Sequence, residues 1–381
     1  MFSSKLEKRS TYSSFSTEEG NDEYFLVLKT APTSHFKKSL EEIRLNFNSA
    51  LAKLSLPLSS LVFSRFYVSD IANQRDLLLK SKIYSECITG ALSVIQQAPL
   101  DTSYLTLFNY FVLPGKKRSC RKKHLSLSKD RWRNGVELTG KNYSMLYTGN
   151  FSGEGVLDSA AQTREIFDSY TSLLERKSMN LLDNCLRTWI YVRDIDNHYQ
   201  GMVDARREFF QKAGLTSTTR YIASTGIEGK SRLVNTLVSM DALSWSGIKK
   251  EQIIRMEALK NLCPTINYNV TFERGTRIVF GDRSHMHISG TASIDSHGNI
   301  LHECDTIKQT RRTLENIRAL LEAQSADLSD MAYLIVYLRD PSSYDAVLDV
   351  IWEEVSRTIP VIAVAGSVCR PGWLVEIEGI A

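Results

Sequence analysis

Three segments of this chain follow one template, and this repetition limits the fold more than any other feature of the sequence. The template is a leucine, eight residues, a tyrosine, a valine or leucine, any residue and an aspartate, and it occurs at 58–70, 182–194 and 328–340. Each copy ends in an apolar, aromatic and β-branched run, which is typical of a buried strand. The closing aspartate favours a turn or a helix N-cap, because its carboxylate accepts from free backbone N–H groups.

The sequence around each template repeats as well. An amphipathic helix is predicted before it, at 40–54, 162–176 and 309–323, and a second helix after it. A closing strand is predicted at 104–112, 232–238 and 373–380. The prediction is an α+β fold of three tandem β-β-α-β-α-β units, each a sheet with two helices on one face.

These repeats divide the chain into six segments: a flexible tail at 1–22, a first unit at 23–113, a basic linker at 114–139, a second unit at 140–245, a linker at 246–269 and a third unit at 270–381. The basic stretch 116–133 carries the clustered Lys and Arg that grip nucleic-acid phosphates. It lacks regularly interleaved aromatic residues, so a solvated connector or exposed hairpin is favoured and nucleic acid is not expected as a partner.

Composition indicates a cytoplasmic globular chain. The formal charge of +4 is small, and the six cysteines stand singly without a CxxC pair, which suits a reducing compartment. No apolar signal-peptide core begins the chain, and no run approaches the eighteen apolar residues of a membrane span. We therefore expect no membrane association.

Two segments resemble chemical motifs without their full patterns. The stretch 224–231 (STGIEGKS) nearly spells a phosphate-binding loop, but it has serine at the first glycine position and precedes a predicted strand. His285 and His287 face one side of a strand, with His302 and Cys304 near them in sequence. No familiar metal spacing accompanies them, so no metal is expected, although one histidine could contact a substrate.

The C-terminal segment has the residues of an acid–base site. Glu376 and Glu378 interrupt an apolar strand and point to the same face of it. Burial in such surroundings raises the pKa of a carboxyl group towards a useful range. Arg370 precedes the strand, where its guanidinium could hold a substrate carboxylate bidentately. The alternative is a surface salt bridge between Arg370 and one of the glutamates.

The other two copies serve as internal controls for this segment. If Leu233 is aligned with Leu374, Asn235 takes the position of Glu376 and Gly229 that of Arg370. The closing strand of the first copy has no acidic residue. The charged pair is therefore not required to build the unit.

The third unit resembles the Rid/YjgF family along its whole length. The similar stretches are 289–294 (SGTASI), 309–317 (QTRRTLENI), 337–340 (YLRD), Cys369-Arg370 and 375–378 (VEIE). This resemblance implies a trimer-like assembly with a site in each cleft between units, of which one is competent here. It also implies that Arg370 holds a substrate carboxylate and that Glu376 activates water to hydrolyse an imine or enamine.

The fused arrangement is similar more narrowly to the chorismatases of this superfamily, which release pyruvate from chorismate. That resemblance implies no cofactor, Glu376 as the general acid, and Cys369 as a second catalytic residue. A cysteine at this position is found in the branch that makes 3-hydroxybenzoate; a dihydroxycyclohexadienoate is the other product. A small carboxylate is then the expected partner of a monomeric pseudo-trimer or a higher homo-oligomer. Imine or enamine deamination, a non-catalytic scaffold and a nuclease remain alternatives. Further candidate substrate contacts are Glu378, Gly290, Arg274, Arg277 and Tyr147.

Overall fold

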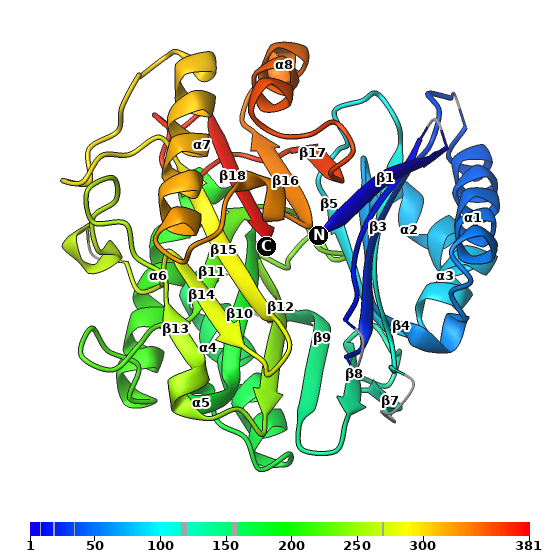
Figure 1. Cartoon of the computed structure of the whole chain (residues 1–381), viewed down its shortest axis with the longest axis horizontal. Coiled ribbons are helices and arrows are strands. Elements are labelled where there is room, and N and C mark those ends of the chain that lie inside the picture. The colour runs from blue at the N-terminus through cyan, green and yellow to red at the C-terminus, as the bar shows by residue number, and fades with distance from the viewer. Residues whose placement is uncertain are drawn as a thin grey trace.

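The computed structural model describes residues 1–7, 9–17, 20–33, 35–115, 120–153, 155, 158–268 and 270–381. Each of the three units forms one six-stranded sheet, and the helices lie on the outside of the assembly (Figure 1). The predicted α+β fold of three tandem units is therefore confirmed.

The elements of the three units follow one another along the chain. The first unit holds β1 (Phe2–Glu7), β2 (Ser10–Phe15), β3 (Asp22–Lys29), α1 (Phe36–Lys53), β4 (Leu61–Val68), α2 (Ile71–Leu79), α3 (Lys82–Cys87), β5 (Ala91–Gln96) and β6 (Leu105–Leu113). The second holds β7 (Arg121–Ser126), β8 (Asn134–Thr139), β9 (Ser144–Ser152), α4 (Ser159–Glu175), α5 (Leu181–Asn184), β10 (Cys185–Val192), α6 (Ile195–Lys212), β11 (Ala223–Glu228) and β12 (Val238–Ser246). The third holds β13 (Ile253–Arg255), β14 (Gly275–Val279), β15 (Ser284–Ala292), α7 (Thr306–Glu322), β16 (Tyr333–Leu338), α8 (Tyr344–Glu354), β17 (Val361–Ala365) and β18 (Val375–Ile380).

All three sheets have the same strand order. Counted within a unit, the order is first, second, third, sixth, fourth and fifth. The fourth and fifth strands run parallel, as in β16 and β17, and the other neighbours run antiparallel. The predicted β-β-α-β-α-β order has four strands. The two additional strands in each unit are the first, which lies at one edge of the sheet, and the fifth, which runs parallel to the fourth.

The prediction of a flexible tail at 1–22 is wrong. β1 pairs with β2, and β2 pairs with β3, so this segment extends the first sheet. The buried Ser13 also donates a hydrogen bond to the carbonyl oxygen of Ala332 in the third unit, at 2.5 Å. The segment is rich in serine, and its strands are held by backbone pairing and small polar side chains. Such strands lack the apolar run that predicts a buried strand.

The two predicted linkers also contain strands of the sheets. The segment 114–139 contributes β7 and β8, and the segment 246–269 contributes β13. Within the basic stretch, residues 116–119 lie outside the described residues. β7 is an exposed edge strand, and an edge rich in Lys and Arg resists pairing with another chain.

The predicted closing strand of the second unit is displaced. The structure has β12 at Val238–Ser246, whereas 232–237 forms a loop in which Val234 is 82% exposed. The Gln162 side chain holds this loop, because its Nε2 donates to the Asn235 oxygen at 2.8 Å and its Oε1 accepts from the Leu237 N–H at 2.8 Å. The prediction is wrong here because a short apolar run can occur in a loop as well as in a strand.

The inner faces of the three sheets meet in one core. Phe63 of the first unit stacks on Tyr147 of the second at 4.3 Å between ring centroids, and Tyr147 stacks on Trp189 at 6.0 Å. Phe108 of the first unit meets Tyr333 of the third at 4.7 Å. Large aromatic rings fill this space and give offset or tilted contacts, so the inner faces of the three sheets share one hydrophobic core. Separate cores lie between sheet and helices in the first and second units.

Backbone bridges join the units in a ring. Gln96 at the end of β5 pairs with Lys230, Ile227 of β11 pairs with Val368, and Val364 of β17 pairs with Pro99. The bridges join the first unit to the second, the second to the third, and the third to the first. The arrangement is a trimer-like ring formed within one chain.

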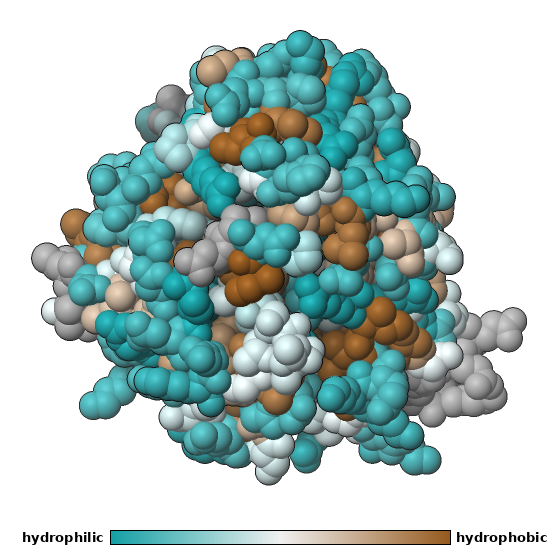
Figure 2. All heavy atoms as spheres, turned by 90° about the vertical axis from the view of Figure 1, so that its left-hand side faces the viewer, coloured by the Kyte–Doolittle hydropathy of each residue, from teal (hydrophilic) through white to brown (hydrophobic). Residues whose placement is uncertain are grey.

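The face in Figure 2 is mostly hydrophilic, with separate hydrophobic patches. Among the residues the structure describes, we find no helix whose length and apolar character would let it cross a membrane.

Candidate active site

The turn before β18 positions the first site residues. The Trp373 N–H donates to the Arg370 oxygen at 3.0 Å, which closes a turn around Pro371 and Gly372, a residue pair that favours turns. Gln309 of α7 fixes this turn, since its Nε2 donates to the Gly372 oxygen at 2.8 Å and its Oε1 accepts from the Leu374 N–H at 2.9 Å.

Gln162 holds the loop of the second unit that corresponds to this turn. The equivalence of Gln162 and Gln309 shows that the alignment of Leu233 with Leu374 is wrong. In the sheet register Tyr337 lies opposite Glu376, whereas the equivalent Tyr191 lies opposite Ser239. Ser239, not Asn235, therefore occupies the position of Glu376, and Leu233 that of Arg370. The conclusion that the second unit lacks both groups is unchanged.

The correct register also reveals a buried acid that the alignment missed. Asp241 in β12 lies opposite Trp189, as Glu378 in β18 lies opposite Ile335. In the first unit, Phe108 has this position and Thr106 has that of Glu376. The position of Glu378 is thus acidic in two units, and that of Glu376 in the third unit only.

Glu376 lines a cavity of about 310 Å³ between the second and third units. Its side chain is 5% exposed, and burial, followed by the neighbouring Glu378, raises the pKa of this carboxyl to about 8. Arg187 and Arg274 act in the opposite direction. A carboxyl group in this state is protonated at neutral pH and suited to donate a proton.

Gly290 of β15 makes room for this carboxyl. A Cβ on Gly290 would lie 2.0 Å from Glu376 Oε1, well inside van der Waals contact. The glycine therefore lets backbone and carboxyl approach closely. Its N–H donates to Thr225 Oγ1 at 3.0 Å, which ties this side of the cavity to the second unit.

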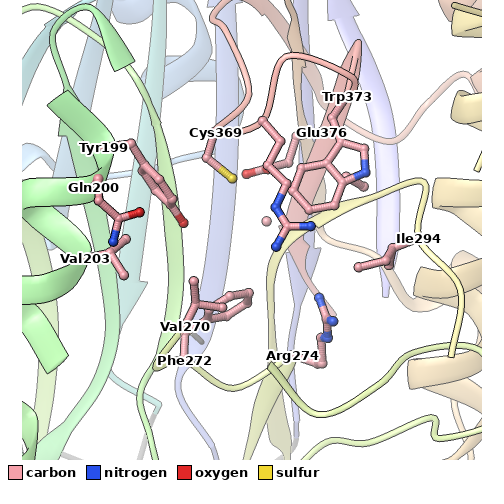
Figure 3. A pocket seen from close by; sticks show the side chains of 13 residues that line it. Tyr199, Gln200, Val203, Val270, Phe272, Arg274, Ile294, Cys369, Trp373 and Glu376 are labelled. Carbon is pink, nitrogen blue, oxygen red and sulfur yellow. The ribbon is translucent and has the colours of Figure 1, made fainter. Parts of the chain in front are cut away.

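Two guanidinium groups line the same cavity (Figure 3). Arg370 lies over the Trp373 ring, 5.0 Å from its centroid. Arg274 is 7% exposed, and its Nε and Nη2 donate to the Cys263 oxygen at 3.2 and 3.0 Å. Guanidinium groups fixed in this way bind carboxylates with defined geometry.

Cys369 lies beside Glu376 in Figure 3 and is half-buried. Burial, with the neighbouring Glu376 next in size, raises the pKa of this thiol to about 12. It is therefore a neutral thiol at physiological pH, which makes it a poor nucleophile but leaves it able to contact substrate.

Other predicted site residues lie away from the cavity. Glu378 is buried below it among side chains of the second and third units. Arg277 donates to Ser284 Oγ at 3.1 Å and to the Gln324 oxygen at 3.0 Å on a different surface. Tyr147 is buried in the central core. Of the candidates, the structure brings together Glu376, Cys369, Arg370, Gly290 and Arg274.

The far wall of the cavity was not predicted. Tyr199, Gln200 and Val203 of α6 project into it from the second unit, and Val270 and Phe272 complete it (Figure 3). Nothing in the helical pattern of α6 marks these residues. The expectation of a cleft between units was the only signal that the second unit would supply them.

The two motif-like segments have structural roles. Within the stretch 224–231, residues up to Glu228 belong to β11. The His285 ring lies 3.1 Å from a Glu23 oxygen, and burial holds the pKa of His287 well below its ordinary value. Among the described residues, no group of three or more His, Cys, Asp and Glu side chains could hold a metal ion.

Comparison with known proteins supports the resemblance noted in the sequence. Residues 277–381 match the family model described as Endoribonuclease L-PSP, the Rid/YjgF family, so the third unit carries a domain of this family. A RidA structure from Psychrobacter sp. PAMC 21119 is 24% identical, and the match covers 33% of this chain and 97% of that one, with a TM-score of 0.28. A Rid protein of unknown function from Yersinia pestis is 23% identical, covering 34% and 98%, with a TM-score of 0.29.

One solved structure matches far more of the chain. A chorismatase is 18% identical and superposes with a TM-score of 0.62, covering 85% of this chain and 93% of that protein. At this identity the similarity establishes the fold, and it extends across the units instead of ending at the third.

Proposed function

We propose that this chain cleaves chorismate and releases pyruvate, and that the reaction takes place in the cavity between the second and third units. The third unit matches the Rid family model, and the fold is that of a chorismatase. The observation that carries the proposal is one buried carboxyl with a raised pKa on the same cavity as two guanidinium groups. Chorismate has two carboxylates and an acid-labile enol ether, so this set of groups matches its chemistry.

The two arginines are the proposed carboxylate anchors. Arg370 stacks on Trp373, and Arg274 is held by the Cys263 oxygen, so both are oriented before substrate arrives. Charge-assisted pairs of this kind are among the stronger hydrogen bonds in proteins. Binding both ends of a dianion places the bond to be broken between them, beside Glu376.

Glu376 is the proposed general acid. It transfers its proton to the terminal methylene carbon of the enolpyruvyl group while the ether oxygen supplies an electron pair, which gives an oxocarbenium ion. Water adds to the oxocarbenium carbon, which bears the ether oxygen, and returns a proton to Glu376. The resulting hemiketal then collapses: the bond from this carbon to the ring oxygen breaks, the hemiketal hydroxyl proton passes to the ring oxygen, and pyruvate and a dihydroxycyclohexadienoate are formed. Loss of one water from this diol gives a hydroxybenzoate, the product expected from the resemblance at Cys369.

The arginines give the first test. Arg370→Ala and Arg274→Ala should each raise KM for chorismate by about 10-fold or more, because a charged hydrogen-bonded contact contributes about 1.5–3 kcal/mol. Arg277→Ala is the matched control, since this cation of the same unit lies outside the cavity. Steady-state pyruvate release measures all three, and an unchanged KM in both cavity variants would refute the anchoring roles.

Gly290 gives the second test. Gly290→Ala should lower kcat/KM by about 10²-fold, the order expected when a catalytic group is displaced by about 1 Å. The control is Gly281→Ala, because a Cβ at Gly281 meets nothing within 4 Å. If Gly290→Ala kept wild-type kcat/KM, the close fit between this glycine and Glu376 would have no catalytic role.

The Rid match supports a second candidate, hydrolysis of an imine or enamine of a small monocarboxylate. Such a substrate needs one guanidinium, Arg370, beside Glu376. The two reactions are distinguished by Arg274→Ala, which should impair binding of a dianion and leave binding of a monoanion largely unchanged.

A further inference from the structure

Glu378 is held beneath the cavity by donors from two units. It forms an ion pair with Arg187 of β10, and Trp189 Nε1 donates to it at 3.0 Å. Tyr337 of β16 donates through its hydroxyl at 2.9 Å, and the Thr225 hydroxyl donates as well. The Glu378 side chain is 1% exposed, and its two oxygens are held by one cation and three further hydrogen-bond donors, which makes this a fully paired buried group.

We propose that Glu378 is a positioning residue, a fixed negative charge below the cavity that acts on the reaction by favouring the protonated form of Glu376. This inference rests on the proposed role of Glu376 as an acid. The two side chains leave the same face of β18 two residues apart, about 7 Å along a strand. Like charges at such a spacing in a protein interior disfavour each other's ionisation.

The charges around Glu376 come from every element packed against it. Glu378 lies on its own strand, and Cys369 and Arg370 lie on the preceding turn. The other titratable groups that face the site are Arg274 before β14, Arg187 of β10, Tyr199 of α6 and Tyr337 of β16. The arginines favour the ionised form of Glu376. Glu378 is the group in this set whose negative charge opposes them.

The second unit contains a matched control. Asp241 has the register position of Glu378 and is also buried in an ion pair, with Arg65. It accepts from the Asn150 N–H at 2.9 Å. The residue two positions before Asp241, at the position of Glu376, is Ser239. The second unit therefore has a buried acid–arginine pair but no second acid whose ionisation this pair could affect.

The test compares pH profiles of kcat/KM. In Glu378→Gln, which keeps an acceptor oxygen for Trp189 and Tyr337, the alkaline limb should move down by about one to two pH units. In Asp241→Asn the alkaline limb should stay at the wild-type pH. A Glu378→Gln profile that is lowered at every pH without moving would assign a structural role and refute the proposal. So would an equal displacement in both variants.

A second measurement does not depend on activity. Carboxyl ¹³C NMR of the chain with ¹³C-labelled glutamate should show a buried carboxyl that titrates near pH 8, identified by its disappearance in Glu376→Gln. Its midpoint should fall by about one to two pH units in Glu378→Gln and stay unchanged in Asp241→Asn. An unchanged midpoint in Glu378→Gln would overturn the inference. This result does not depend on whether chorismate is the substrate, so it separates failure of the inference from failure of the proposed function.

Discussion

Replacing Glu376 by Gln should reduce kcat for pyruvate release by about 10²–10⁴-fold, the usual contribution of a positioned general acid. Gln keeps the size and hydrogen-bonding atoms of the side chain but cannot supply the proton. Because the carboxyl is buried and carries no ion pair of its own among the interactions described above, the variant should remain folded. Coupled assay of pyruvate, beside the circular dichroism of both proteins, measures the effect.

The pH dependence of the wild type should carry the same signature. A general acid works while protonated, so kcat/KM should be retained below about pH 8 and fall as the pH rises through the pKa of Glu376. Glu322→Gln is the control for Glu376→Gln and should keep the wild-type kcat and pH profile, because Glu322 is exposed on α7. A Glu376→Gln variant with more than about one tenth of wild-type kcat, below the lower end of that range, would contradict the role of this residue.

Replacing Arg65 by Met should lower the free energy of unfolding by about 3–5 kcal/mol, as expected when one partner of a buried ion pair is removed. Arg65 lies on β4 of the first unit and is 1% exposed. Its Nε and Nη2 donate to Asp241 of the second unit at 3.2 and 3.0 Å. Its guanidinium also lies 4.8 Å from the Trp189 ring centroid. The substitution would leave the Asp241 carboxylate buried without its cation at the junction of two units.

Urea unfolding of the whole chain measures this loss. Arg164→Met is the matched control, because the Arg164–Glu208 pair is exposed on both sides and such pairs contribute about 0–1 kcal/mol. Arg65→Met combined with Asp241→Asn should recover part of the stability, since the buried charge is then gone. A loss for Arg65→Met no larger than that of the control would show that the junction does not depend on this pair.

The parts of the fold that were predictable are those with continuous apolar runs. β4, β10 and β16 are buried at every position, so their template could be read directly. β2 and β7 carry Ser, Tyr, Lys and Arg and are held largely by backbone pairing, which leaves little signal in side-chain chemistry. β12 was harder to predict because Asp241 interrupts its apolar run. Asp241 is paired with Arg65, which belongs to the first unit, so nothing near Asp241 in the sequence explains a buried acid there.

The same distinction applies to the site. Glu376 and Arg370 are close in sequence, and their unusual chemistry in an apolar strand could be recognised there. Strand alternation puts Glu378 on the same face as Glu376, but it does not tell which one reaches the cavity. That depends on Gly290, which leaves space for Glu376, and on Arg187 of the second unit, which pairs with Glu378. Contacts between units follow from the packing of three sheets and are not encoded in local spacing.

The most direct test of the central claim is the stoichiometry of pyruvate release from chorismate by the purified chain, followed together with chromatography of the ring product. We expect one pyruvate for each chorismate consumed, at a rate far above spontaneous decay, with a hydroxybenzoate or a dihydroxycyclohexadienoate formed in equal amount. No release above the spontaneous rate by a folded chain would contradict it.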